Sequence, residues 1–116
     1  MPIFASEAAL LEVIRIHDQL LESVASGELD FCDFCEKYND FYAFYALDGH
    51  ESDAGEQAWL EKYNTLIEPH RVVYEDILSL VCSDDDAKRE IYKQAGRIGS
   101  FEAVRRIKLL LKNAGQ

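Results

Sequence analysis

Hydrophobic residues recur every three to four positions along most of the chain, which is the spacing of one face of an α-helix. The first such stripe covers residues 10–24. Ser6 precedes it and is a favourable N-cap residue, while Gly27 follows it and suits the left-handed conformation that ends many helices. These signals predict a first helix between Ser6 and Gly27, with His17 on its inner face.

A second stripe, at residues 31–45, is unusually rich in aromatic side chains, and Asp30 stands where it can cap a helix. Residues 48–56 are the most polar stretch of the chain and predict a loop. Helical spacing returns from about residue 53 and continues to residue 82, with Pro69 inside it. Because proline lacks a backbone donor and clashes with the preceding turn, this segment is either one kinked helix or two helices.

Ser83 and the three aspartates at residues 84–86 form a strong signal for a helix start, because they suit the positive end of the helix dipole. We expect a short helix there, ending before a turn that Gly96 and Gly99 bracket. Ser100 is predicted to cap the last helix. The positions of that helix expected to face inward are Phe101, Val104, Ile107, Leu110 and Leu111.

No segment alternates long enough to predict a strand, and two prolines and six glycines are too few for a many-stranded fold. A length of 116 residues is typical of one domain. We therefore predict an all-α protein, a single-domain antiparallel bundle of four to five helices over residues 1–116. Whether Pro69 kinks or splits a helix stays open at this point, as does the oligomeric state.

The chain carries 22 acidic and 12 basic residues, a net charge of -10, but this charge is polarised. Residues 1–86 hold 20 acids and four bases, a net charge of -16, whereas residues 87–116 hold two acids and eight bases, a net charge of +6. A diffuse binder of nucleic acid or of an anionic membrane needs the opposite balance. We expect a basic protein partner for the acidic body, and no direct contact with nucleic acid or membrane. Alternatively, the basic tail packs beside the acidic body and neutralises part of it.

The cysteines offer the first candidate chemistry. Cys32-x-x-Cys35, with Cys82 and a histidine, has the ligand types of a zinc site, but structural zinc sites usually pair two such clusters. Helical spacing of three also suits cysteines that pack as small hydrophobic residues, and this is the interpretation we favour. A metal-binding bundle remains an alternative.

Other catalytic and cofactor patterns are missing from the sequence. It contains no Glu-x-x-His pair for a di-iron bundle, no glycine-rich phosphate loop, no calcium loop and no nucleophile elbow. We therefore expect neither enzymatic activity nor a cofactor. An odd number of cysteines, no leader-like start and no apolar run of membrane-spanning length together predict a cytoplasmic protein.

The most distinctive feature is a cluster of acids between aromatic residues, because interfaces often combine aromatic anchors with complementary charge. We predict that this cluster binds a partner, although a solvated loop beside ordinary core aromatics is the alternative. The predicted partner-binding residues are Asp40, Tyr45, Asp48, Glu51, Asp53, Glu56 and Trp59.

Residues 25–38 resemble a segment of small α-helical bacterial immunity proteins, of the colicin D and contact-dependent growth-inhibition types. There a first helix ends in a Gly-Glu-(Ile/Leu) turn, and a capped helix with aromatic and acidic residues follows. The matching residues are Gly27, Glu28, Leu29, Asp30, Phe34 and Tyr38. The resemblance implies a small cytoplasmic protein that blocks a cognate toxin domain, often a basic nuclease. A nucleic-acid-mimicking inhibitor of another enzyme is the second alternative.

Overall fold

The computed structural model describes residues 4–39, 41–45, 47, 49 and 53–114. This part of the chain is helical, and its one bridge of strand type is an isolated parallel contact between Val81 and Ile98. The prediction of an all-α bundle is confirmed, but the helices are divided more finely than four or five. The elements are α1 (Glu7–Ser26), α2 (Phe31–Tyr38), α3 (Phe41–Phe44), α4 (Ala54–Lys62), α5 (Asn64–Val72), the π-helix η1 (Val73–Ile77), the 3-10 helix η2 (Leu78–Leu80), α6 (Asp84–Ala87), α7 (Glu90–Gln94) and α8 (Ser100–Ala114).

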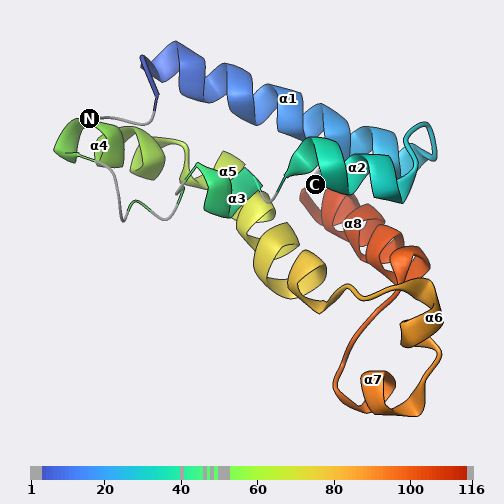
Figure 1. Ribbon diagram of the computed structural model, residues 1–116. Helices are drawn as coiled ribbons and strands as arrows, with labels where there is room; N and C mark the ends of the chain where they lie inside the picture. The colour runs from blue at the N-terminus through green and yellow to red at the C-terminus, as the bar shows by residue number, and fades with distance from the viewer. Residues whose placement is uncertain (1–3, 40, 46, 48, 50–52, 115–116) are drawn as a thin grey trace.

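Helix α1 is the longest element, and both of its predicted ends are confirmed. The Ala9 amide donates to the Ser6 hydroxyl at 3.1 Å, and Gly27 adopts the left-handed conformation with φ 86°. The chain then reverses, so that α2 runs back along α1, and α8 packs against α1 as well (Figure 1). Helix α1 therefore packs against both α2, which follows it in the sequence, and α8, the last helix.

The second aromatic stripe forms two helices where one was predicted. Asp30 caps α2 as expected, accepting from the Cys32 amide at 3.1 Å. Asn39 then takes a left-handed conformation with φ 49°, and its amide bonds to the Cys35 carbonyl at 3.0 Å. Asparagine tolerates this conformation better than most residues, so the helix ends there and restarts as the single turn α3.

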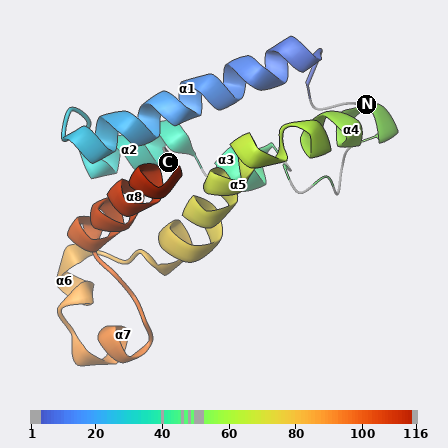
Figure 2. The ribbon, with the colours of Figure 1, turned by 180° about the vertical axis from the view of Figure 1, so that it is seen from behind.

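The segment from Ala54 to Leu80 is also divided, but not at the proline. The break falls at Tyr63, between α4 and α5, whereas Pro69 lies inside α5. Four residues after Pro69 the helix widens into η1, and Figure 2 shows α4, α5 and the following turns as one path in green and yellow. Proline cannot donate the bond of an ordinary helical turn, yet α5 continues on both sides of Pro69.

The last helix is capped from another element. Ser83 caps α6 as predicted, since its hydroxyl accepts from the Asp86 amide at 3.1 Å. The prediction that Ser100 caps α8 is wrong, because Asp84 takes that role, accepting from the Ser100 amide at 2.7 Å and from its hydroxyl at 2.9 Å. Gly99 permits this approach, since a Cβ there would lie 2.8 Å from the Asp84 carboxylate.

The core joins α1, α2, α3, α5, η1 and α8. Its apolar members are Phe4, Leu10, Ile14, Leu21, Val24, Phe34, Tyr38, Phe41, Leu47, Leu60, Ile67, Val73, Ile77, Ile98, Ala103 and Ile107. Of the positions expected to face inward on α8, Ile107 is buried and three others are half-buried. Phe101 is the exception, because 85% of it is exposed.

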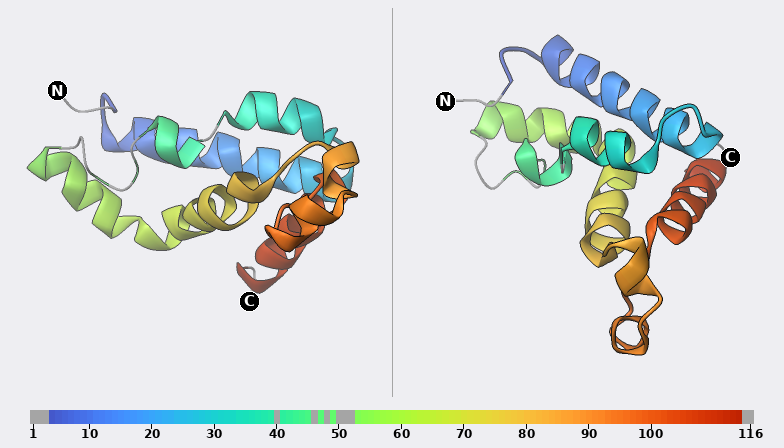
Figure 3. Two further views of the ribbon diagram at one scale, coloured as in Figure 1. Left: turned by 60° about the horizontal axis from the view of Figure 1, so that its bottom comes forward. Right: turned by 45° about the vertical axis from the view of Figure 1, so that its right-hand side comes forward.

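The molecule is elongated, with extents of 47 × 27 × 25 Å and a radius of gyration of 15.3 Å. A compact chain of this length has a radius of gyration of about 13 Å. Helix α4 lies at one end, and the short helices α6 and α7 lie at the other (Figures 1 and 3). No helix within the described ranges is long and apolar enough to cross a membrane.

Candidate partner-binding groove

The structure separates the seven residues of the predicted acidic–aromatic face. Asp40, Asp48 and Glu51 lie outside the described residues. Asp53 is exposed at the start of α4, where its carboxylate accepts from the Glu56 amide at 2.8 Å. Asp53 therefore has a helix-capping role, and its position leaves it accessible to a partner.

Glu56 does not lie on an exposed face, and its assignment to one is wrong. The residue is 1% exposed, and its carboxylate accepts from the Phe4 amide at 2.9 Å. Glu56 and Leu60 are four residues apart, so they share the inward side of α4. The carboxylate thus connects the N-terminal segment to α4 instead of facing solvent.

Tyr45 and Trp59 are half-buried and pack against the core. The Tyr45 ring stacks on Phe4 with centroids 5.2 Å apart and meets Phe41 edge-on at 5.5 Å. These contacts match the alternative interpretation of the aromatics as neighbours of the core. Neither of them lines the open hollow beside α4 and α5, whose aromatic lining residue is Tyr42 of α3.

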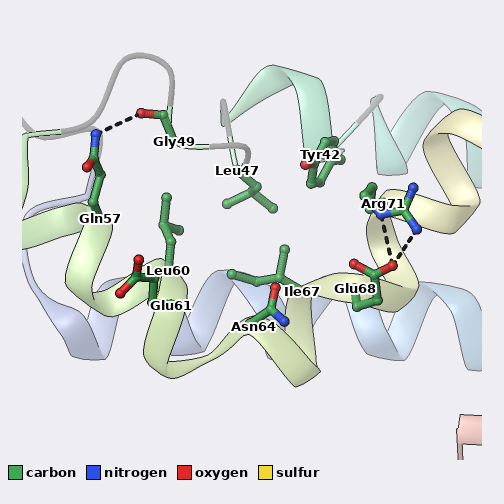
Figure 4. A pocket seen from close by; sticks show the side chains of 10 residues that line it. All are labelled: Tyr42, Leu47, Gly49, Gln57, Leu60, Glu61, Asn64, Ile67, Glu68 and Arg71. Atoms are coloured by element: carbon green, nitrogen blue, oxygen red, sulfur yellow. Dashed lines mark hydrogen bonds and ion pairs between the residues drawn. The ribbon is translucent and has the colours of Figure 1, made fainter.

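That hollow is a groove of about 530 Å³ between α3, the segment that follows it, and α4–α5. In Figure 4 the side chains of Leu47, Leu60 and Ile67 point toward one another across its floor, and Tyr42 lies beside them. Polar side chains surround this apolar floor, and one of them, Gln57, donates to the Gly49 carbonyl at 3.3 Å. The other polar lining residues are Glu61, Asn64, Glu68 and Arg71.

The ridge beside the groove, residues 53–77, is strongly acidic. It holds six acids and two bases, a net charge of -4. Both bases are engaged in ion pairs: Lys62 reaches Glu7 of α1 at 2.9 Å, and Arg71 lies between Glu68 and Glu75. The side chains of Glu61 and Asp76 are exposed on the same ridge.

Arg71 lines the groove and binds two carboxylates of the ridge. Its Nη1 donates to Glu75 at 2.6 Å and its Nε donates to Glu68 at 2.9 Å. The hydrogen bonds from Arg71 lower the pKa of Glu68, so this carboxylate stays ionised at neutral pH. Because two carboxylates hold the guanidinium, it adds little positive potential to the rim.

Sequence reasoning missed a buried polar chain next to this ridge. His70 of α5 is fully buried, its Nδ1 lies 2.5 Å from the Tyr38 hydroxyl, and its Nε2 lies 2.6 Å from the Asp18 carboxylate. The carboxylate accepts, so Nε2 carries the proton and Nδ1 accepts from the tyrosine. Burial raises the pKa of Tyr38 far above its ordinary value, which keeps the hydroxyl a donor.

The hydrogen-bonded side chains of Asp18, His70 and Tyr38 join α1, α5 and α2, but they do not line the groove. His70 has no solvent access, so a substrate cannot reach its imidazole. Its arrangement therefore stabilises the packing of three helices. Nothing in the spacing of Asp18, Tyr38 and His70 signals this contact, because the three residues come from distant parts of the chain.

No group of three or more His, Cys, Asp or Glu side chains in the described ranges is placed to hold a metal ion. Comparisons of the chain with protein-family models, with curated proteins and with solved structures gave no match. The case for a function therefore depends on the groove, its charge and the sequence resemblance.

Proposed function

We propose that this protein is an immunity protein, which binds a cognate bacterial toxin domain and neutralises it without catalysis. The observation that carries the proposal is the groove, in which the half-buried Tyr42 and the outer edges of buried core residues lie beside a ridge with six acids and two bases. Protein interfaces commonly place apolar contacts at the centre and charged residues at the rim. Such a surface fits a partner that presents an apolar side chain within a basic patch.

The expected partner is a basic nuclease domain. The cleft of such an enzyme attracts phosphates, and carboxylates at an inhibitor's surface exploit the same potential. Glu61 and Glu68 supply carboxylates at the groove itself, and Asp53, Glu75 and Asp76 extend the negative charge along the ridge. The proposed face is thus the α4–α5 side of the predicted acidic cluster, without Glu56.

The residues that carry the resemblance support the proposal through the fold. Gly27 ends α1, Asp30 caps α2, and Phe34 and Tyr38 are buried in the core. They build the turn between the first two helices and do not line the groove. We therefore assign partner recognition to α4 and α5, and assign the resembling segment to the scaffold.

The proposal predicts a toxin domain in an adjacent open reading frame, and the test uses that domain with its catalytic activity removed. Glu61→Arg reverses one exposed charge at the groove, and Glu36→Arg makes the same change on an exposed position of α2. We expect Glu61→Arg to weaken binding about tenfold or more, a loss of roughly 1.4 kcal/mol, and Glu36→Arg to change it much less. Calorimetry or surface plasmon resonance measures both.

Protection of cells provides the second measurement. Cells that express the active toxin domain should grow when they also express this protein, and should lose protection with Glu61→Arg when expression is limiting. Absence of binding to the toxin domain contradicts the proposal. Inhibition of unrelated DNA-binding enzymes in competition with DNA also contradicts it, because that behaviour belongs to a nucleic-acid mimic.

A further inference from the structure

All three cysteines of the chain line one hollow. Cys32 and Cys35 lie on α2, and Cys82 lies between η2 and α6, yet the three border the same space of about 340 Å³. This hollow is lined by a different set of residues from the partner-binding groove. It brings Cys82 together with two thiols that lie 47 and 50 residues away in the sequence, which the proposed binding function does not require.

The three thiols differ in exposure. Cys32 is exposed, whereas Cys35 and Cys82 are half-buried, and none of the three is part of a disulfide. Cys82 donates a weak hydrogen bond from Sγ to the Ile98 carbonyl, with a separation of 3.6 Å. An accessible thiol beside a more protected one is the usual arrangement of an oxidisable cysteine and its resolving partner.

We propose that the hollow is a site of reversible oxidation, in which hydrogen peroxide drives formation of a disulfide between Cys32 and Cys82. The Cys32 thiol loses its proton, the thiolate attacks one peroxide oxygen, the O–O bond breaks, and the hydroxide that leaves takes up that proton, so the products are a Cys32 sulfenic acid and water. The Cys82 thiol likewise loses its proton, its thiolate attacks the Cys32 sulfur, the S–O bond breaks, and the departing hydroxide takes up this second proton to leave as water. The two thiols lose two electrons in total, and peroxide accepts them.

Cys35 is a poor partner for Cys32, although it is nearest in sequence. Cβ atoms three residues apart on a helix lie about 5–6 Å from each other, whereas a disulfide needs a separation of about 3.8 Å. That bond would pull the two Cβ atoms closer than the turn of α2 holds them, so it would strain that turn. Cys82 belongs to a separate segment that lines the same hollow, so a bond to Cys32 does not have to close within one helical turn.

The bond would connect two parts of the chain that meet at the start of α8. Cys82 immediately precedes Ser83, which caps α6, and Asp84 of α6 caps α8. A crosslink from α2 to this junction closes a long loop and reduces the conformational freedom of the unfolded chain. Oxidation therefore raises the thermal midpoint of unfolding, and reduction reverses the change.

Peptide mapping tests the proposal on the full chain. The protein is treated with hydrogen peroxide, alkylated, and digested with trypsin without reductant. Cleavage after Arg15, Lys37, Arg71 and Lys88 places Cys32 and Cys35 on residues 16–37, and Cys82 on residues 72–88. We expect these two peptides to be joined, with a mass about 2 Da below their sum for the two hydrogens lost. A thiol reductant should separate them.

Single substitutions identify the participating sulfurs. Cys35→Ser should retain the joined peptides, whereas Cys32→Ser and Cys82→Ser should each abolish them. Circular dichroism of the reduced variants shows that they are folded, and the rise in thermal midpoint on oxidation should occur only where the joined peptides form. Three results would overturn the proposal: no joined peptides in the unmodified chain, a lighter 16–37 peptide carrying a Cys32–Cys35 bond, or joined peptides that survive in Cys32→Ser.

Discussion

Single side chains decide how the helices of this protein are held together, and the clearest case is the buried chain of Asp18, His70 and Tyr38. Every polar group in it has a partner, which is what a buried network needs in order to stabilise. Asp18 is half-exposed and accepts from the imidazole, so the charged end of the network stays in contact with water. The neutral end, Tyr38, lies in the core.

Tyr38→Phe tests this network, because it removes the hydroxyl and keeps the ring. His70 Nδ1 would be left buried without its donor, so we expect the free energy of unfolding to fall by about 1–3 kcal/mol. Tyr74→Phe, on η1 and outside the network, is the matched control and should change the stability by less than about 0.5 kcal/mol. Urea unfolding followed by circular dichroism measures both. Equal effects of the two substitutions would contradict the assigned role.

Residue-scale prediction from the sequence succeeded where a signal is local. Ser6, Gly27, Asp30 and Ser83 act at the helix ends for which they were chosen, because a cap depends on residues only two to four positions away. The prediction that Glu56 lies on an exposed face was wrong for the opposite reason. Its position inside depends on the Phe4 amide, 52 residues distant, and no local pattern reports such a contact.

At the scale of elements, one helix end is capped by a side chain from another part of the chain. The Asp84 carboxylate satisfies the first amide of α8 across 16 residues, and the bonds from Ser100 hold the pKa of Asp84 below its usual value. The lowered pKa means that the ionised form stabilises the native state. This contribution is complete above the unfolded pKa of about 4 and is lost as the pH falls through the folded value.

Asp84→Ala should therefore lower the thermal midpoint of unfolding by a few degrees at pH 7, and the difference from the unmodified protein should shrink below pH 4. Asp84→Asn keeps one acceptor and should recover part of the loss. Asp85→Ala, at the neighbouring exposed aspartate, is the control and should change little. A loss that persists undiminished at low pH would show that the carboxylate charge does not matter. Calorimetric scans over a pH series provide the measurement.

Two helix boundaries differ from those that the hydrophobic spacing predicted. Asn39 interrupts an apolar stripe whose spacing continues on both sides, and only its left-handed backbone reveals the break. Pro69 left open a kinked helix or two helices, and the segment does divide, but six residues earlier, at Tyr63, with Pro69 inside α5. Helix type was thus predictable from period and composition, whereas the division into segments depended on tertiary contacts.

At the scale of the whole molecule, the charge that is polarised along the sequence is brought partly together in space, because α8 packs against α1 and Asp84 of α6 caps α8. The acidic ridge at residues 53–77 keeps a net charge of -4 beside the proposed groove, away from the short helix α7 (Figure 1). If the partner is a basic domain, as we propose, the charge of this ridge favours its approach to the groove. Charge of this kind acts mainly on the rate of encounter, since it operates before the surfaces touch.

The association rate of the complex should accordingly depend on ionic strength, while the dissociation rate should not. Raising the salt from about 50 mM to about 500 mM shortens the Debye length from about 14 Å to about 4 Å, so we expect association to slow about tenfold or more. The short-range contacts of the proposed interface form after docking, and added salt screens such contacts much less than it screens the long-range attraction. Stopped-flow measurements with the inactive toxin domain separate the two rates. Glu61→Arg should show a weaker salt dependence than Glu36→Arg, because Glu61 lines the proposed groove and Glu36 does not. An association rate that is unaffected by salt would show that electrostatic attraction to the acidic ridge does not drive association.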